Sequence, residues 1–365
     1  MRIAHVSDTH LGYRQYNLDE REKDIYEAFN EAVDRAVEER ADVLIHSGDL
    51  FDSPTPPIRA LYVFKSALRR IDGKMKVYTV LGDHDTPKRR GMPPHKLFDV
   101  RVLGVRRLEW EEVGGVLIAG ISNLRGRGVE LLKRELGKFD AIAEKYEKSV
   151  LVAHQAIERY LPFEGAYELK EDDLPRKATY YAFGHLHSRI AVRFGGGYLA
   201  YAGSTEIIRK DEISSWSRRG KGFYLVDLDR DEVTVHEINL DIRPQLEVEV
   251  EEERLEEVLS FVRHPHNKPP ILHITVKGEN VNRQHVIGRL SELLKDKVLS
   301  FKPSFRDLSR QLPPELPRGV INLESIMREY LGGDELARLA MSILDRLSQD
   351  DIEGARRVVE EFLEG

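Results

Sequence analysis

The stretch Ile3-Ala4-His5-Val6-Ser7-Asp8-Thr9-His10 begins as an apolar run and ends in two residues that commonly bind metal ions, Asp8 and His10. Four later stretches repeat this plan of an apolar run followed by Asp or His, and their polar residues are Asp49, Asp83-His84-Asp85, His154 and His185-Leu186-His187. Short apolar runs are typical of buried strands in an α/β sheet, and loops after the carboxyl ends of such strands converge at one edge. The sequence therefore predicts an α/β fold that brings the five segments together.

These five segments indicate one metal site rather than five unrelated loops. Histidine and aspartate together suit divalent cations such as Mn²⁺, Fe²⁺ and Zn²⁺. A soluble protein would rarely place so many ionisable groups at consecutive strand ends without a cation to compensate their charge. The number of candidate ligands predicts a site for two metal ions, an arrangement suited to the hydrolysis of phosphoesters.

The order of the motifs follows the pattern D-x-H, G-D, G-[N]-H-[DE], H and G-H-x-H, and so resembles the calcineurin-like metallophosphoesterase family. Three segments narrow the resemblance to SbcD/Mre-type nucleases of DNA double-strand-break repair, with an archaeal member as the closest match: Asp8 to Tyr16, Gly48 to Phe51 and Gly184 to His187. The match runs to about Leu240 and continues more weakly to the end. It implies two stacked mixed sheets flanked by helices, a small α+β cap and a C-terminal helical tail.

The resemblance also assigns roles to the candidate residues. Asp49 would bridge two divalent ions, expected to be Mn²⁺, because the two oxygens of one carboxylate can reach both. The remaining ligands fall into two sets, Asp8, His10 and His187 for one ion and Asp83, His154 and His185 for the other. His84 would lie beside the metals without binding them and donate a proton to the leaving oxygen or stabilise charge in the transition state. Asp85 is expected to orient His84.

Asp83 departs from the family pattern, which normally has Asn at this position. An Asn carbonyl can bind a metal while its amide donates a hydrogen bond to phosphate. Asp83 can still bind a metal, but it adds negative charge where an anionic substrate must approach. We favour a tolerated ligand exchange with altered metal preference and a lower rate. The alternative is a change that weakens turnover while keeping metal and DNA binding.

A chain of 365 residues is too long for one ordinary core and predicts two or three units. The alternating pattern that starts at Gln245 and three prolines between Pro313 and Pro317 mark the changes in organisation. The predicted parts are a metallophosphoesterase nuclease domain over 1–240, an α+β capping domain over 241–302, a Pro-rich linker over 303–319 and a helical ATPase-binding segment over 320–365.

Within the first part, the apolar periodicity predicts an amphipathic helix over 22–38 and, among short strands, one helix near Val129 to Tyr146. A further helix after Pro57 is apolar around more of its circumference than one buried face needs. In the family this region, together with a helix around His95 to Asp99, forms a homodimer through a four-helix bundle. The corresponding dimer candidates are Ile58, Leu61, Tyr62, Leu97 and Phe98.

The tail carries apolar residues at helical spacing after Asp334. A helical hairpin behind a Pro-rich linker cannot bury its apolar face alone, so it needs a partner or the body of its own chain. The resemblance implies docking on the coiled coil of an SMC-like ATPase of the SbcC/Rad type, whereas packing on the same chain is the alternative. The candidate contact residues are Leu336, Leu339, Ile343, Leu344 and Leu347.

The net charge of −7 does not by itself indicate a nucleic-acid partner. A polyanion needs a local positive field rather than a positive total, and bound divalent metals would add to that field. Lys88-Arg89-Arg90 follows Asp85 almost directly and is expected to contact DNA phosphate.

The chain contains no Cys, so it has no disulfide framework and no thiolate metal ligand. No apolar run approaches ~18 residues and the start of the chain carries no signal-peptide pattern. These features favour a cytoplasmic protein, associated with the nucleoid if it acts on DNA. Charged residues make up 33% of the chain, which favours a heat-adapted source.

Three functions are consistent with these observations. The resemblance implies a Mn²⁺-dependent nuclease, a 3′-to-5′ exonuclease on duplex DNA and an endonuclease on single strands that acts with its ATPase partner. The ligand set alone also fits a metallophosphoesterase for small phosphoesters or cyclic nucleotides. A third possibility is a non-catalytic DNA-end tether, in which Asp83 has compromised the chemistry.

Overall fold

In the computed structural model, the described residues are 1–87, 91–161, 165–229, 232–262, 268–307, 323–331 and 333–348, together with residues 354, 356, 358, 359 and 362. They belong to two compact units, Met1–Leu308 and Ser309–Gly365, each described here by itself. Among the described residues, the first unit has two six-stranded sheets and one three-stranded sheet. No helix in the described part of the chain is both long and apolar enough to cross a membrane.

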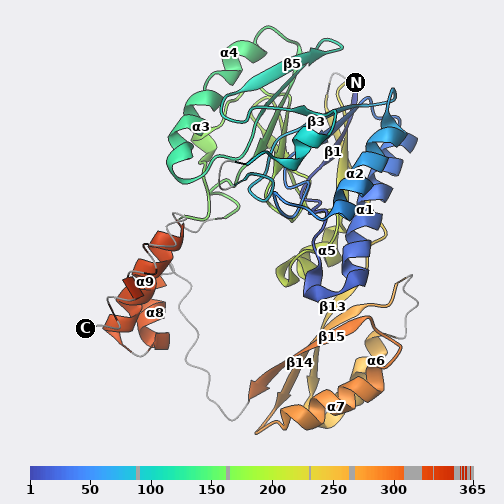
Figure 1. Ribbon diagram of the computed structural model, residues 1–365, viewed down its shortest axis with the longest axis vertical. Helices are drawn as coiled ribbons and strands as arrows, with labels where there is room; N and C mark the ends of the chain where they lie inside the picture. Colours follow the sequence, from blue (N-terminus) through green and yellow to red (C-terminus); the bar gives the residue numbers. More distant parts are fainter. Residues whose placement is uncertain are drawn as a thin grey trace. The chain divides into compact units, whose positions relative to one another are not determined.

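The first sheet has the strand order β12-β11-β1-β2-β3-β4. Strands β1 to β4 are parallel, whereas β11 and β12 pair antiparallel. Helices α1 (Asp19–Glu38) and α2 (Ile58–Ile71) lie side by side over one face of it (Figure 1). The strands are β1 (Arg2–Val6), β2 (Val43–His46), β3 (Lys76–Thr79), β4 (Arg101–Val102), β11 (Gly222–Asp227) and β12 (Thr234–Asn239).

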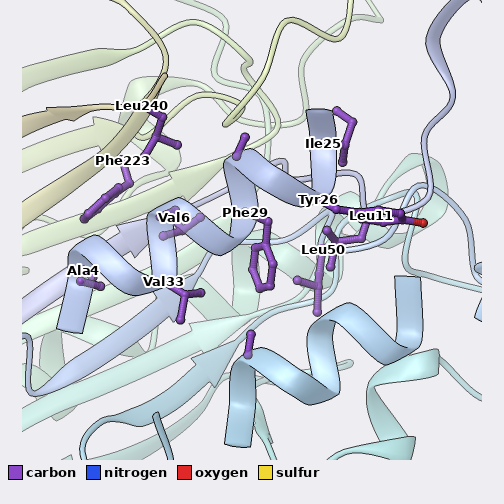
Figure 2. Close-up of a cluster of buried hydrophobic side chains, with 14 of the residues drawn as sticks. Ala4, Val6, Leu11, Ile25, Tyr26, Phe29, Val33, Leu50, Phe223 and Leu240 are labelled. Carbon is purple, nitrogen blue, oxygen red and sulfur yellow. The ribbon is translucent and has the colours of Figure 1, made fainter. Parts of the chain in front are cut away.

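The core under α1 explains why the sequence forms this layer. Ile25, Phe29 and Val33 recur at helical spacing and are buried against the first sheet, as the amphipathic pattern predicts. Figure 2 shows them packed with Val6 of β1 and Phe223 of β11. Leu11 and Leu50, which immediately follow ligand-bearing segments, belong to the same cluster and so tie those loops to the core.

The second sheet has the order β5-β6-β7-β8-β10-β9 and is also mixed. Residues from the inner faces of both sheets form one cluster, for example Ile45 and Tyr78 with Ile118, Val152 and Ala200. The predicted pair of stacked mixed sheets is therefore confirmed. The strands are β5 (Glu109–Val113), β6 (Val116–Ile121), β7 (Lys148–His154), β8 (Tyr180–Gly184), β9 (Ile190–Phe194) and β10 (Gly197–Tyr201).

The prediction of one helix near Val129 to Tyr146 is wrong. The structure has two helices on this sheet, α3 (Val129–Leu136) and α4 (Phe139–Ala143). Gly137 caps α3 and has low helix propensity, so the chain breaks there. A further short helix, α5 (Ile213–Arg219), precedes β11.

The third sheet is fully parallel and consists of β13 (Gln245–Glu251), β14 (Ile271–Gly278) and β15 (Ser300–Asp307). Its crossover connections contain α6 (Val258–Phe261) and α7 (Arg283–Leu294), the small unit that the alternating pattern predicts. Strand β15 stays paired with β14 up to Asp307, so the linker does not begin at residue 303. The rest of the predicted linker lies outside the described residues.

The second unit contains α8 (Leu323–Leu331) and α9 (Asp334–Ser348), which contact each other. Ala337 is buried, whereas Leu336 and Leu344 of the same helix are exposed. Leu339 and Ile343 are half-buried, and the side chain of Leu347 lies outside the described residues. The pair therefore leaves part of its apolar surface uncovered.

Candidate metal centre

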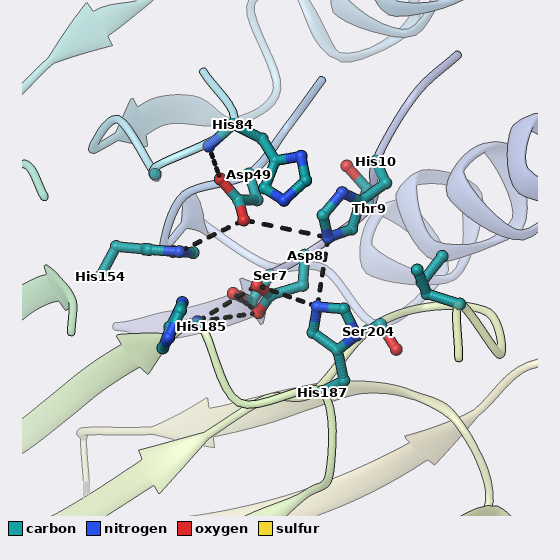
Figure 3. Close-up of polar contacts among 12 residues, drawn as sticks. Ser7, Asp8, Thr9, His10, Asp49, His84, His154, His185, His187 and Ser204 are labelled. Atoms are coloured by element: carbon teal, nitrogen blue, oxygen red, sulfur yellow. Dashed lines mark hydrogen bonds and ion pairs between the residues drawn. The ribbon is translucent and has the colours of Figure 1, made fainter. Parts of the chain in front are cut away.

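The polar segments meet where the carboxyl ends of parallel strands from both sheets face each other. Strands β1, β2 and β3 of the first sheet lead into Asp8 and His10, into Asp49, and into Asp83 and His84. Strand β7 ends at His154, and β8 leads into His185 and His187. Figure 3 shows the labelled members of this group pointing toward one another. All seven predicted metal-ligand residues thus lie in the same region.

The backbone at this edge is unusual. Asp8, His10, Asp49 and His185 all have positive φ, at 49°, 45°, 54° and 94°. L-residues rarely adopt this left-handed conformation, and such strain is concentrated at functional sites. Gly82 lets two of these loops lie close together, because a Cβ at this position would lie 2.0 Å from Oδ1 of Asp49.

The first potential metal-binding group comprises Asp8, His10 and His187. The Nε2 atoms of His10 and His187 are 3.2 Å apart, and Nε2 of His187 lies 3.9 Å from Oδ1 of Asp8. The two imidazole nitrogens share a hydrogen bond, and both could instead bind one divalent cation.

The second group comprises Asp83, His154 and His185. Oδ1 of Asp83 lies 3.2 Å from Nε2 of His154 and 3.2 Å from Nδ1 of His185. One carboxylate oxygen therefore faces both imidazoles, a donor set that suits a divalent transition metal.

Asp49 lies between the two groups. Its Oδ2 is 3.4 Å from Nε2 of His154 and 3.9 Å from Nε2 of His10. Its Oδ1 accepts a hydrogen bond from the backbone N–H of His84 at 2.9 Å. Oδ2 of Asp49 therefore faces both groups, and the role of Asp49 as a bridge between two ions stays a prediction.

Three of the imidazoles have a second partner that fixes the ring. Nδ1 of His154 lies 2.9 Å from the carbonyl oxygen of Ser47, and Nδ1 of His187 lies 2.7 Å from Oε1 of Glu212. Nδ1 of His10 lies 3.2 Å from Oδ1 of Asp52. An Nδ1–H donated to each acceptor leaves the Nε2 lone pair directed at the centre, as in histidine that binds a metal. The residues present therefore fit two metal ions.

The charges around these imidazoles favour cations at the centre. Burial lowers the pKa of His10, but the hydrogen bond to Asp52 and the charges of Asp49 and Asp8 outweigh it and raise the pKa to about 9. For Asp49 the effects have the opposite signs. Burial alone would raise its pKa, but His154 and His10 outweigh burial and lower that pKa. A proton on His10 therefore balances the neighbouring carboxylates until a metal takes its place.

His84 lies beside the two groups, with its ring edge-on to that of His10 at 4.7 Å between centroids. Asp85 does not orient it, so that expectation is wrong. The buried carboxylate of Asp85 instead accepts hydrogen bonds from the backbone N–H groups of Leu50, Phe51 and Gly82. It fixes the loop that carries the site.

Three residues near the ligands were not predicted. Asp52 takes the place expected for Asp85, because its carbonyl oxygen lies 2.9 Å from Nδ1 of His84. Glu212 and Arg125 reach His187 and His185 from segments far away in the sequence.

The remaining candidates lie elsewhere. Lys88, Arg89 and Arg90 fall outside the described residues. Of the dimer candidates, Ile58, Tyr62 and Leu97 are strongly exposed, whereas Leu61 and Phe98 are half-buried against the core.

Comparison with known proteins agrees with this arrangement. Residues 1–189 match the family described as calcineurin-like phosphoesterase. The DNA double-strand break repair protein Mre11 of Thermoplasma acidophilum is 37% identical over an alignment that covers 98% of this chain and 96% of that protein. Mre11 proteins of Saccharolobus solfataricus and Methanocaldococcus jannaschii are each 35% identical, over 96% and 94% of this chain and 96% and 95% of their own lengths. The chain therefore belongs to the calcineurin-like phosphoesterases, which are hydrolases, and within them to the Mre11 family of DNA double-strand break repair proteins.

Proposed function

We propose that the chain is a two-metal nuclease that hydrolyses DNA phosphodiester bonds with Mn²⁺. The observation that carries this proposal is the position of Asp49, whose Oδ2 faces His154 of one metal-binding group and His10 of the other. Two divalent ions held there would polarise the phosphate and lower the pKa of an attacking water. In this proposal Asp8, His10 and His187 hold one ion, Asp83, His154 and His185 hold the other, and Asp49 is shared.

His84 is the proposed proton donor. Its Nδ1 lies 2.9 Å from the carbonyl oxygen of Asp52, an acceptor that fixes the ring through Nδ1–H. The side chain is 44% exposed, so Nε2 is accessible to a substrate. A protonated His84 would transfer a proton from Nε2 to the leaving oxygen, which is a poor leaving group as an alkoxide.

DNA is the proposed substrate, because the Mre11 relatives named above match nearly the whole chain. The proposed activities are 3′-to-5′ exonuclease on duplex DNA and endonuclease on single strands, at the nucleoid in the cytoplasm. The segment 241–302 would act as a cap that holds DNA over the site, and Lys88-Arg89-Arg90 would contact phosphate.

We also propose two protein partners. The exposed apolar side chains of Ile58, Tyr62 and Leu97 support a homodimer contact, which would remove them from water. The uncovered apolar side chains of α9, Leu336 and Leu344, support docking of the tail on an SMC-like coiled-coil ATPase.

The test is digestion of end-labelled linear duplex DNA in Mn²⁺, Mg²⁺ or chelator, by the wild type and by His84→Asn. We expect laddering in Mn²⁺ that disappears in chelator and falls by about 10²- to 10⁴-fold in the variant. Mn²⁺ stoichiometry should be the same in both proteins, because His84 is not a proposed ligand. Bound Mn²⁺ without cleavage by the wild type would contradict the nuclease, and turnover of a small phosphodiester alone would favour a small-ester enzyme.

A further inference from the structure

The loop that follows β6 carries a basic residue, Arg125, at the edge of the second metal-binding group. This loop is fastened to the site at Asn123, whose side-chain amide donates to the carbonyl oxygen of His154 at 2.8 Å. The backbone N–H of Asn123 also donates to the carbonyl oxygen of Leu81 at 2.8 Å. Arg125 therefore extends from an anchored loop, and its side chain remains 44% exposed.

The guanidinium of Arg125 contacts two of the proposed metal ligands. Nη1 lies 3.0 Å from Oδ2 of Asp83, and Nη2 lies 3.1 Å from Nε2 of His185. Both Nη atoms thus face the centre, where the phosphate of a substrate would have to approach.

The other edge of the guanidinium is held away from the centre. Nε of Arg125 lies 3.2 Å from Oε1 of Glu168, a carboxylate that is 9% exposed. Oε2 of Glu168 accepts a hydrogen bond from the backbone N–H of Ala156 at 2.8 Å, two residues after His154. This clamp orients Arg125 through Nε and leaves its Nη donors free to change partners.

The charges of Asp83 and Arg125 affect how a DNA phosphate binds here, an inference that rests on the proposed function. Asp83 adds a negative charge beside the approaching phosphate and, unlike Asn, has no amide donor. Arg125 contacts Oδ2 of Asp83, whereas Oδ1 is the oxygen that faces His154 and His185. Each Nη carries two N–H groups, so donors remain for a phosphate oxygen when a metal is bound. A guanidinium stays charged at any physiological pH, and its fork of donors matches phosphate oxygens.

We propose that Arg125 is a substrate-binding residue. Its Nη donors bind the non-bridging oxygens of the DNA phosphate at the metal-loaded site, and its charge offsets that of Asp83. The pair of Asp83 and Arg125 thereby provides a metal-binding oxygen and a phosphate donor from two side chains.

The test compares Arg125→Gln with Arg127→Gln, which removes the same charge from the same exposed loop. Binding of an unmodified oligonucleotide is measured by fluorescence anisotropy in Mn²⁺, with His84→Asn added to each protein to suppress cleavage, and kcat/KM is measured on the same DNA without that change. Calorimetric titration with Mn²⁺ alone reports on the metal site without DNA.

We expect Arg125→Gln to weaken oligonucleotide binding and lower kcat/KM by about 10- to 100-fold, the loss typical of a hydrogen bond between charged groups. Arg125→Lys should recover part of the loss, because it keeps the charge but not the fork. Affinity for Mn²⁺ should not fall, because a positive charge is removed from beside the cations. Arg127→Gln should resemble the wild type.

Equal DNA binding by Arg125→Gln and Arg127→Gln would overturn the proposal. A fall in Mn²⁺ affinity that matches the fall in DNA binding would also overturn it, because Arg125 would then only position Asp83. Failure of the wild type to cleave DNA would overturn the proposed function, whereas the comparison of DNA binding would still decide the role of Arg125.

Discussion

Nδ1 of His187 lies 2.7 Å from Oε1 of Glu212, a buried carboxylate that also binds the buried ammonium group of Lys221. Ser204 and the backbone N–H groups of Ile208 and Arg209 donate to the same carboxylate. Burial alone would raise the pKa of Glu212, but Lys221 and His187 outweigh it and lower that pKa. One anionic group therefore orients a proposed metal ligand and balances a buried cation.

The first prediction concerns this carboxylate. Glu212→Gln should weaken Mn²⁺ binding on the order of 10- to 100-fold, because His187 loses the anion that orients it. The free energy of unfolding should fall by about 3–5 kcal/mol, because Lys221 is left buried without a countercharge. Calorimetric titration and urea denaturation measure the two effects, and Glu144→Gln on the surface is the control. Unchanged Mn²⁺ affinity in a destabilised Glu212→Gln would leave Glu212 with a structural role only.

The second prediction concerns Asp83. Asp83→Asn should bind Mn²⁺ roughly tenfold more weakly, because the ligand loses its charge. It should turn over DNA faster, because the site repels phosphate less and gains an amide donor. Metal titration and single-turnover cleavage test both effects, with Asp172→Asn on the surface as the control. Equal affinity and equal rate in Asp83→Asn and the wild type would refute any effect of the exchange.

Much of the site was predictable because its signals are local. An apolar run that ends in Asp or His identifies both the strand and the residue at its carboxyl end, so Asp8, Asp49 and His154 could be placed together from sequence. The two stacked sheets were expected from the resemblance to the family.

The errors arose where the fold, rather than the neighbouring sequence, decides a contact. Asp85 follows His84 directly, but the turn directs its carboxylate to the backbone of Leu50 and Phe51. Glu212 reaches His187 across 25 positions and Arg125 reaches His185 across 60. No periodicity encodes such pairs.

The third prediction is that the free energy of unfolding changes with pH in opposite directions with and without metal. The pKa of His10 is about 9 in the fold and about 6.5 unfolded. Because the folded pKa is the higher one, the stabilisation is fully present below pH 6.5 and is lost as pH rises through 9. In chelator, the free energy of unfolding should therefore fall over this window, by up to about 3 kcal/mol.

With Mn²⁺ the free energy of unfolding should instead rise with pH. The metal competes with the proton on His10, and that proton is weakly held at high pH. Urea denaturation at several pH values, with and without Mn²⁺, measures both slopes. In His10→Gln the free energy of unfolding in chelator should fall less steeply with pH. A free energy of unfolding that rises with pH in chelator would show that the acidic residues around His10 do not hold its proton.

The fourth prediction concerns the exposed apolar face of α2. Ile58 is 84% exposed in the single chain, and Tyr62 and Leu97 are also exposed. Ile58→Glu should convert a dimer into a monomer, because it would place an unpaired charge in an apolar contact. Light scattering after size-exclusion chromatography measures the mass, and Ile287→Glu on α7 is the control for a charge at another exposed isoleucine. A variant that remains dimeric would place the contact elsewhere, and a monomeric wild type would refute the dimer itself.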